Sequence, residues 1–393
     1  MELYDKCYQF TEAKEAMEKG YYPYFIPLSD TEGTEVTIGD RRLIMIGSNN
    51  YLGLTTHPKV REAAIEAIRR YGTSCTGSRF LNGTLALHNQ LEEELADFVG
   101  KEAALVFSTG YQTNVGTISA LVGRDDVVIT DKEDHASIVD GCRLAFGTMH
   151  RFRHADMDSL ERTLAKCQLD QGKLVVVDGV FSMGGDIAPL PEIISLCKRY
   201  RARLMVDDAH SVGVLGENGR GTPAHFGVTN DVDLIMGTFS KSFASLGGFI
   251  AGDEVAIHYI QHHARSLIFS ASMPAANVAA CLAALDIMRT EPERPARLKA
   301  IADRMRQGYR ELGYDTGASE TPIIPIIIGD DMPTFTMWRA LLDAGVYTNP
   351  VIPPAVPPSK SLLRTSYMAT HTDEQMDRVL TLFEKVGKQV GVI

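Results

Sequence analysis

The chain has 393 residues, of which 45% are hydrophobic and 23% are charged, and its formal net charge is −11. This length and composition predict a soluble globular protein with a large core and an attached smaller domain. The acidic balance argues against general binding to nucleic acid or to anionic membranes, and no apolar run of about 18 residues predicts a membrane span.

The residues before position 57 predict a small group of elements. They are a helix over 11–20, an extended aromatic segment over 21–25 and strands over 35–38 and 43–47. From there on, helices and strands alternate. Apolar positions recur at helical spacing over 60–71 and 86–98, which predicts two further helices.

Six short apolar runs define the main sheet. They are residues 103–107, 126–130, 173–178, 203–206, 233–236 and 248–251. Each has the length of a strand and is apolar almost throughout, which is typical of strands buried on both faces of a sheet. We therefore expect an α/β fold with a mostly parallel central sheet.

The remaining residues predict a smaller C-terminal unit. Its elements are helices over 277–289, 296–312 and 373–389 and strands over 322–328 and 362–367. The first of these helices is expected to link the two units, and the proline-dense segment 349–358 is expected to form a loop near the site. The predicted division is an N-terminal segment (1–55), a large domain (56–285) and a small α+β domain (286–393).

The cysteines and the first residues bear on the cellular compartment. The six cysteines are scattered and form no Cys-x-x-Cys pair, as is usual for a protein kept reduced inside the cell. The first residues are charged rather than apolar, so no secretory signal is expected. We therefore expect a cytoplasmic protein, for which the sequence leaves a peripheral membrane contact open. No metal site is predicted.

Lys241 lies in the segment Gly-Thr-Phe-Ser-Lys-Ser (237–242), and glycines follow it at 247 and 248. A surface lysine has no need of such neighbours. A lysine that forms a Schiff base needs space for a flat cofactor, hydroxyls for its phosphate and desolvation that lowers the pKa of the amine. We therefore predict that Lys241 binds pyridoxal phosphate (PLP), with Thr238 as the preferred phosphate donor and Ser240 as the second candidate.

Two acids, Asp207 and Asp208, end the strand over 203–206. In such a position one acid turns inward and the other caps the next turn. We assign the inward position to Asp207, because an acid beside the pyridine nitrogen keeps the ring protonated and able to accept electrons. His210 is placed within reach of the phenolic oxygen of the cofactor, although alone it would be interpreted as a core histidine.

Two further segments follow strands at the same expected sheet edge. Residues 108–114 open a helix with small side chains and free backbone N–H groups, which predicts the phosphate site once a phosphate cofactor is inferred. His135 is flat enough to cover one face of a pyridine ring, although such a histidine is more often an ordinary loop residue. Ser182 lies where ligands bind in open α/β sheets, and a plain turn serine is an equal alternative.

Arg364 lies in an otherwise apolar strand. Such an arginine is exposed at an edge, paired, or directed into a cavity. In a cavity, its planar guanidinium suits the carboxylate of an amino acid through two parallel hydrogen bonds. The residues alone do not decide among these three alternatives.

Together these motifs resemble the α-oxoamine synthase family of fold-type I PLP enzymes over nearly the whole chain. The segments that carry the resemblance are SNNYLGL (48–54), GSRFLNGT (77–84), DHASIVDG (134–141), DDAH (207–210), GTFSK (237–241) and FSAS (269–272). Members of this family condense an amino acid with an acyl-CoA and lose CO₂. The resemblance implies a fold-type I transferase with a seven-stranded central sheet.

The resemblance implies roles for individual residues toward the cofactor. Lys241 would carry PLP, Asp207 would pair with the ring nitrogen and His135 would stack on the ring. The other contacts would come from Ser182 and His210 at the phenolic oxygen and from Gly110, Tyr111 and Thr238 at the phosphate.

Further residues match positions for the substrate and for a second subunit. Ser272 matches the residue that reaches the cofactor phosphate of the neighbouring subunit, which implies a homodimer with shared active sites. Arg364 matches a position that holds the substrate carboxylate, and so do Asn49 and Ser78. His135 is also placed against the substrate.

Three parts of the chain resemble the soluble bacterial branch of the family that condenses L-serine with palmitoyl-CoA. They are 20–25, 77–84 and 354–357 with Arg364 and 367–372, and Ser240 before the lysine fits the same branch. Asp208 departs from it, since that branch often has glutamate there and the branch that uses alanine and pimeloyl-CoA has aspartate. Alanine with pimeloyl-CoA, glycine with acetyl-CoA and a catalytically silent PLP-fold protein are the alternatives; Lys241, Asp207 and His135 argue against the last.

Overall fold

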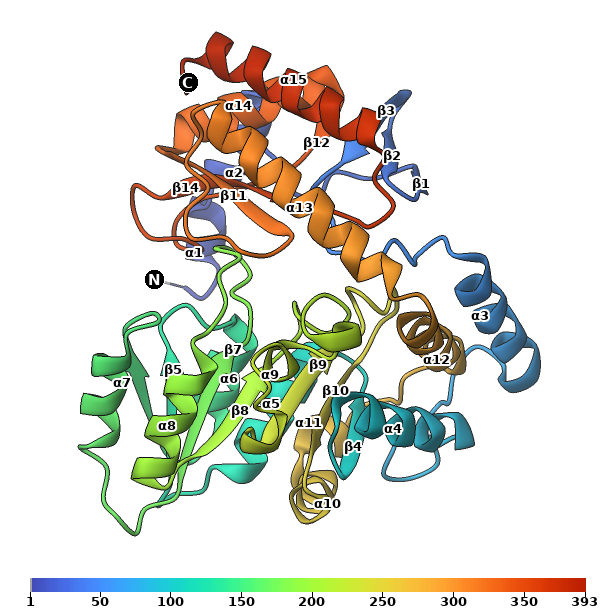
Figure 1. Cartoon of the computed structure of the whole chain (residues 1–393), viewed down its shortest axis with the longest axis vertical. Helices are drawn as coiled ribbons and strands as arrows, with labels where there is room; N and C mark the ends of the chain where they lie inside the picture. The colour runs from blue at the N-terminus through green and yellow to red at the C-terminus, as the bar shows by residue number, and fades with distance from the viewer. Residues whose placement is uncertain (1) are drawn as a thin grey trace.

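The computed structural model describes residues 2–393, which form a larger and a smaller part (Figure 1). The larger part contains a seven-stranded sheet with the order β4-β10-β9-β8-β7-β5-β6. Its strands are β4 (Ala103–Phe107), β5 (Val127–Asp131), β6 (Thr148–Phe152), β7 (Lys173–Asp178), β8 (Arg203–Asp207), β9 (Leu234–Thr238) and β10 (Gly248–Gly252). All but β10 run in one direction, since β10 is antiparallel to both of its neighbours. The predicted mostly parallel sheet is confirmed.

Strand β6 is the one strand of this sheet that the apolar runs did not locate. It lies at the sheet edge, and of its sequence Thr-Met-His-Arg-Phe only Phe152 is buried. By contrast, β5, β7, β9 and β10 are buried along their whole length. An edge strand keeps exposed polar side chains, so it lacks the continuous apolar run that identifies the central strands.

Helices cover both faces of the sheet because successive side chains of a strand point to opposite faces. Val176 and Met205 pack in one apolar layer, and Val175 and Val206 pack in the other. The first layer includes α5 (Gly110–Leu121), α6 (Ala136–Leu144), α10 (Glu254–His263) and α11 (Arg265–Ile268). The second includes α4 (Ala86–Val99), α7 (Met157–Leu164), α8 (Leu190–Tyr200) and α12 (Ala275–Thr290). The short helix α9 (Thr222–His225) and helix α3 (Pro58–Tyr71) complete the larger part.

The smaller part combines both ends of the chain. Its antiparallel sheet has the order β11-β14-β13, formed by β11 (Ile323–Gly329), β14 (Ser361–Ser366) and β13 (Asn349–Val351). A second sheet has the order β1-β2-β3-β12, formed by β1 (Asp30–Glu32), β2 (Glu35–Ile38), β3 (Arg41–Met45) and β12 (Val346–Tyr347). The helices are α1 (Asp5–Gln9), α2 (Glu12–Glu18), α13 (Glu293–Glu311), α14 (Asp331–Ala344) and α15 (Asp373–Val390). Because β12 pairs with β3, the N-terminal strands belong with the C-terminal elements.

Helix α13 runs from the end of α12 into the smaller part (Figure 1). The sequence pattern assigned this link to residues 277–289, but that helix, α12, packs on α3 and α4 of the larger part. The proline-dense segment 349–358 also differs from expectation, because it begins with β13 rather than with a loop. The domain boundaries near residues 55 and 285 stay a prediction.

Candidate active site

A cavity of about 260 Å³ lies where three parallel strands of the main sheet end. Strands β7, β8 and β9 end at Asp178, Asp207 and Thr238, and all three residues line the cavity. In open α/β sheets, ligands bind outside the carboxyl ends of the strands. The cavity therefore lies where this fold places a binding site.

Most of the residues predicted to contact the cofactor line this one cavity. They are Gly110, Tyr111, His135, Ser182, Asp207, His210, Thr238, Ser240 and Lys241. Ser272 and the predicted substrate residues Asn49, Ser78 and Arg364 are not among its lining residues. The fold thus gathers the predicted cofactor set from segments far apart in the sequence and leaves the other four residues outside the cavity wall.

Lys241 follows β9 and is half-buried in the cavity wall. Burial lowers the pKa of its amine to about 8, although the carboxylates of Asp207 and Asp178 act in the opposite direction. Only the neutral amine acts as a nucleophile or as a base. The lowered pKa therefore gives Lys241 a substantial reactive fraction near neutral pH.

In the cofactor-free protein, Lys241 should react with trinitrobenzenesulfonate at a rate that is half-maximal near pH 8 and levels off about one to two pH units higher. An amine is half deprotonated at its pKa, and an ordinary lysine reaches this midpoint only at about pH 10.4. Peptide mass spectrometry over a series of pH values measures the rate at this lysine alone. A half-maximal rate near the midpoint of an ordinary lysine would contradict the lowered pKa.

Asp207 and Asp208 lie in different environments. Oδ2 of Asp207 accepts a hydrogen bond from Asn114 Nδ2 at 2.6 Å, and its Oδ1 accepts one from the Ala209 N–H at 3.1 Å. Asp208 is fully buried outside the cavity wall and accepts from the Thr222 N–H at 2.8 Å. Its Oδ1 has no hydrogen-bond partner among residues 2–393, and burial raises its pKa to about 7. This geometry agrees with the assignment of the inward position to Asp207.

The N-terminus of α5 opens toward the cavity and forms a cradle for an anion. The side chain of Thr109 caps the helix, and the N–H groups of Gly110 and Tyr111 are left without intrahelical partners. A Cβ at Gly110 would lie 2.6 Å from Thr238 Oγ1, so only glycine allows the helix to approach β9 this closely. The hydroxyls of Thr238 and Ser240 lie 3.1 Å apart at the same end. Free N–H groups and hydroxyls at a helix N-terminus suit a phosphate.

The side chain of Tyr111 is engaged outside this cradle. Its hydroxyl donates a hydrogen bond to Asp140, and this bond raises the pKa of the phenol. The residue is 46% exposed. Tyr111 therefore offers the cradle its backbone N–H rather than its hydroxyl.

His135 precedes α6 and forms another side of the cavity. Its backbone N–H donates to Asp178 Oδ2 at 3.2 Å, and its Nδ1 accepts from the Ser137 N–H at 3.3 Å. A backbone N–H can only donate, and the Ser137 hydroxyl, 2.7 Å from Nδ1, already accepts from Asn114 and can give its own proton to Nδ1, so the proton of the neutral ring lies on Nε2. Burial lowers the pKa of His135, with Asp207 acting in the opposite direction. The ring is thus a neutral donor through Nε2.

Arg364 is buried in β14, in the smaller part of the molecule. Its Nε donates to the carbonyl oxygen of Ser182 at 2.6 Å, and one Nη donates to Asn49 Oδ1 at 2.9 Å. Ser182 lines the cavity, so Arg364 holds part of the cavity wall without itself lining it. The sequence left open whether Arg364 is exposed at an edge, paired, or directed into a cavity. In the structure it is paired, with Ser182 and Asn49.

Ser78 and Ser272 lie on adjacent segments, since the Ser272 N–H donates to the carbonyl oxygen of Gly77 at 2.8 Å. Both hydroxyls are buried and have no hydrogen-bond partner among residues 2–393. A buried polar group without a partner is unfavourable by about 1–3 kcal/mol. These two hydroxyls are therefore suited to a partner from outside the chain.

Asp178, Asn114 and Tyr51 are polar residues at the site to which the sequence analysis gave no individual role. Asp178 lines the cavity, and burial raises its pKa well above the ordinary value. It carries the same signal as Asp207, an acid at the end of an apolar strand, and could have been found by it. Asn114 also lines the cavity, one helical turn after the anion cradle. Tyr51 contacts His210 from outside the wall, and its sequence neighbours give no signal for this role.

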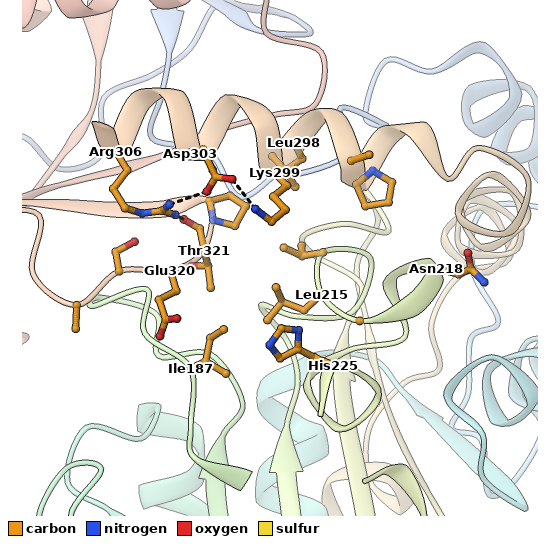
Figure 2. Close-up of a pocket in the computed structure, with 18 of the residues that line it drawn as sticks. Ile187, Leu215, Asn218, His225, Leu298, Lys299, Asp303, Arg306, Glu320 and Thr321 are labelled. Atoms are coloured by element: carbon orange, nitrogen blue, oxygen red, sulfur yellow. Dashed lines mark hydrogen bonds and ion pairs between the residues drawn. The ribbon is translucent and has the colours of Figure 1, made fainter. Parts of the chain in front are cut away.

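A larger cavity, of about 710 Å³, lies between α13 and loops of the larger part (Figure 2). Lys299 and Arg306 of α13 both donate to Asp303, while Leu215 and His225 face them across the cavity. None of the predicted site residues lines it. The smaller cavity is therefore the candidate active site.

Within residues 2–393, no group of three or more His, Cys, Asp or Glu side chains is arranged to hold a metal ion. The same part of the chain has no helix that is both long and apolar enough to cross a membrane.

Comparison with known proteins gives consistent matches along the chain. Residues 41–383 match the family aminotransferase class I and II. A serine palmitoyltransferase of Sphingobacterium spiritivorum is 50% identical over 390 residues, which cover 99% of this chain and 98% of the relative. An 8-amino-7-oxononanoate synthase of Geobacter sulfurreducens is 44% identical over 385 residues, which cover 97% of this chain and 98% of the relative. A solved structure of SPT with PLP internal aldimine has a TM-score of 0.97 at 37% identity and covers 100% of both chains.

These matches confirm the predicted fold type I and the predicted cofactor. The family match spans most of the chain, and the relatives cover nearly all of it. The chain belongs to the aminotransferase class I and II family and, within it, to the PLP-dependent α-oxoamine synthases.

Proposed function

We propose that the protein is an acyltransferase that condenses L-serine with palmitoyl-CoA and releases CoA and CO₂. The product is 3-ketodihydrosphingosine, and the reaction is the first step of sphingolipid synthesis. The observation that carries the proposal is one cavity lined by Lys241, Asp207 and His135, in a chain 50% identical to a serine palmitoyltransferase along its length.

The groups around the cavity fit those of PLP. When bound, PLP supplies an electron sink that stabilises negative charge at the Cα of an amino acid. The open cradle at Gly110, with the Thr238 and Ser240 hydroxyls, suits the phosphate. Asp207 suits the ring nitrogen, and Lys241 suits the aldehyde carbon. Ser182 and His210 are assigned to the phenolic oxygen and His135 to the face of the ring.

The side chains of Lys241 and His135 move and direct protons in this proposal. Nζ of Lys241 accepts the proton from the Cα of serine, and its pKa of about 8 suits a base that works near neutral pH. A base positioned in this way contributes roughly 10²–10⁴-fold to the rate. His135 excludes water from the cavity, and its Nε2–H donates to the substrate carboxylate or to the thioester oxygen.

Arg364 is proposed to hold the carboxylate of serine. A guanidinium has five N–H donors, of which Ser182 and Asn49 occupy one each. The free donors provide the paired hydrogen bonds that arginine makes to carboxylates. Asn49 and Ser78 complete the proposed substrate contacts.

Replacing Arg364 by alanine should raise the KM for serine about 10- to 150-fold, because hydrogen bonds to a charged group contribute about 1.5–3 kcal/mol. The KM for palmitoyl-CoA should change much less. Steady-state kinetics with each substrate varied in turn measures both constants. Arg306→Ala is the matched control, since Arg306 is a second buried arginine of the smaller part and lies outside the candidate site. A larger change for palmitoyl-CoA than for serine would move Arg364 to the CoA site.

We propose a homodimer with shared active sites. Ser272 and Ser78 have buried hydroxyls without partners in the described chain, and Phe80, Leu81 and Phe269 beside them are 53%, 78% and 73% exposed. An exposed apolar cluster next to unsatisfied polar groups is typical of a surface that another chain covers. Light scattering should give twice the chain mass of 43.1 kDa, and Phe269→Glu should lower it. A monomeric wild type would contradict the shared sites.

A cytoplasmic location is also proposed. All six cysteines lie within the described residues and are free thiols, as expected in a reducing compartment. Fractionation of cells that express the protein tests this location and would also reveal peripheral attachment to membranes.

The substrates are tested by product identification. Purified protein with PLP is incubated with serine, alanine or glycine against acetyl-, pimeloyl- and palmitoyl-CoA, and the products are identified by mass spectrometry. Serine with palmitoyl-CoA should be the fastest pair. Alanine with pimeloyl-CoA is the second candidate, favoured by Asp208 and by the relative at 44% identity. If that pair is faster, the serine proposal is wrong, and no turnover with any pair would indicate a silent PLP-fold protein.

A further inference from the structure

A fully buried tyrosine connects two parts of the candidate site. The hydroxyl oxygen of Tyr51 lies 2.6 Å from Nδ1 of His210 and 3.3 Å from Oδ1 of Asn49. The same Asn49 oxygen accepts a hydrogen bond from Arg364 at 2.9 Å. His210 lines the cavity and Tyr51 does not, so Tyr51 acts on the cavity only through His210.

The hydroxyl has a single proton, and the two distances decide where it points. Hydrogen bonds donated by a hydroxyl fall mostly within about 2.5–3.0 Å. The 2.6 Å contact with His210 lies within this range, and the 3.3 Å contact with Asn49 lies outside it. In addition, the Asn49 oxygen already accepts from a charged donor. The proton of Tyr51 therefore points to Nδ1 of His210.

We propose that Tyr51 is a positioning residue that donates a hydrogen bond to Nδ1 of His210 and thereby keeps the ring proton on Nε2. Because Nδ1 faces the buried tyrosine, Nε2 is the nitrogen left for the cavity, and among residues 2–393 it has no hydrogen-bond partner. An Nε2–H donates to an oxygen in the cavity, whereas a bare Nε2 would repel one. The inference rests on PLP binding in this cavity, where His210 is assigned to the phenolic oxygen, and it is independent of which amino acid reacts.

The charge states of the two side chains agree with this arrangement. Burial lowers the pKa of His210 well below its ordinary value, and Lys241 and Arg364 lower it further. The ring is therefore neutral and has one proton to place. Burial raises the pKa of Tyr51 to about 12, so its hydroxyl keeps the proton that it donates.

The first test uses NMR to determine which ring nitrogen of His210 carries the proton. Full-length protein labelled with nitrogen-15 at histidine is measured by NMR before PLP is added, and the His210 signals are identified by their loss in His210→Asn. Wild-type protein should show a bare Nδ1 and a protonated Nε2. Tyr51→Phe should lose this single tautomer. A proton on Nδ1 in the wild type, or an unchanged tautomer in Tyr51→Phe, would overturn the proposal.

The second test asks whether Tyr51 acts through His210. Tyr51→Phe should weaken PLP binding about 3- to 10-fold, as expected for one hydrogen bond, and should have no further effect in a His210→Asn background. Tyr309→Phe is the matched control, because Tyr309 shares a buried hydroxyl contact of 2.6 Å with Tyr367 outside the cavity. It should leave PLP affinity unchanged. Equal weakening by Tyr51→Phe in both backgrounds would show a general structural role and refute the proposal, whatever substrates the enzyme uses.

Discussion

Lys241→Ala should abolish turnover, with a loss of at least about 10²–10⁴-fold, because the variant lacks the amine that is proposed both to hold the cofactor and to act as the base. The fold should persist, since Lys241 lies half-buried in a cavity wall rather than in the core. Activity assays and thermal unfolding measure the two effects separately. In wild-type protein, borohydride reduction should fix the cofactor on the peptide that contains Lys241.

Lys101→Ala is the matched control for this variant. Lys101 also has a pKa lowered by burial, but its amine donates to the carbonyl oxygens of Thr229 and Val232, away from the cavity. Its loss should lower the free energy of unfolding and leave the borohydride label on the peptide of Lys241. A label on any other lysine would contradict the assignment.

Asp207→Asn should reduce kcat by about two to four orders of magnitude, since the proposed ion pair with the ring nitrogen would lose one partner, and such a loss in a buried pair costs about 3–5 kcal/mol. Both carboxylate oxygens of Asp207 accept hydrogen bonds, from Asn114 and from the Ala209 N–H. An amide can accept at only one of these positions and presents a donor to the other. Some PLP should remain bound, which the visible absorbance of the purified variant measures.

Asp208→Asn provides the comparison for Asp207. Oδ1 of Asp208 has no partner among residues 2–393, so an amide can place its NH₂ there and still accept from Thr222. Activity should stay within a few-fold of wild type. If Asp208→Asn is the more damaging of the two variants, the acid beside the ring nitrogen is Asp208.

The sequence predicted the central strands because their burial on both faces leaves a continuous apolar run. It missed β6, whose polar residues are exposed at the sheet edge, and it missed the pairing of β3 with β12, which depends on contacts between distant segments. It also assigned the link between the two parts to α12 rather than to α13. Apolar periodicity indicates that a segment is a helix, but it does not indicate which part of the molecule the helix packs against.

The predicted residues that line the cavity could be found from the sequence because their local motifs lie at or just after the ends of strands, and parallel strands bring such motifs to one edge. Arg364 could not be placed in this way, since its partners Ser182 and Asn49 come from segments far from β14. Tyr51 was missed for a related reason. Its role lies in a hydrogen bond to His210 across the fold, and no local pattern indicates such a contact.

The pairing of β3 with β12 also limits the order in which the protein can be completed during synthesis. Ile44 pairs with Val346, about 300 residues later in the chain. At about 5–20 residues per second, the N-terminal strands wait about 15–60 s for their partner. The lining of the candidate active-site cavity comes from residues 109–247 and is made well before that point. A chain that stops before β12 thus has the cavity residues without the arginine proposed to hold serine, and the edge of β3 stays open to pairing with other chains.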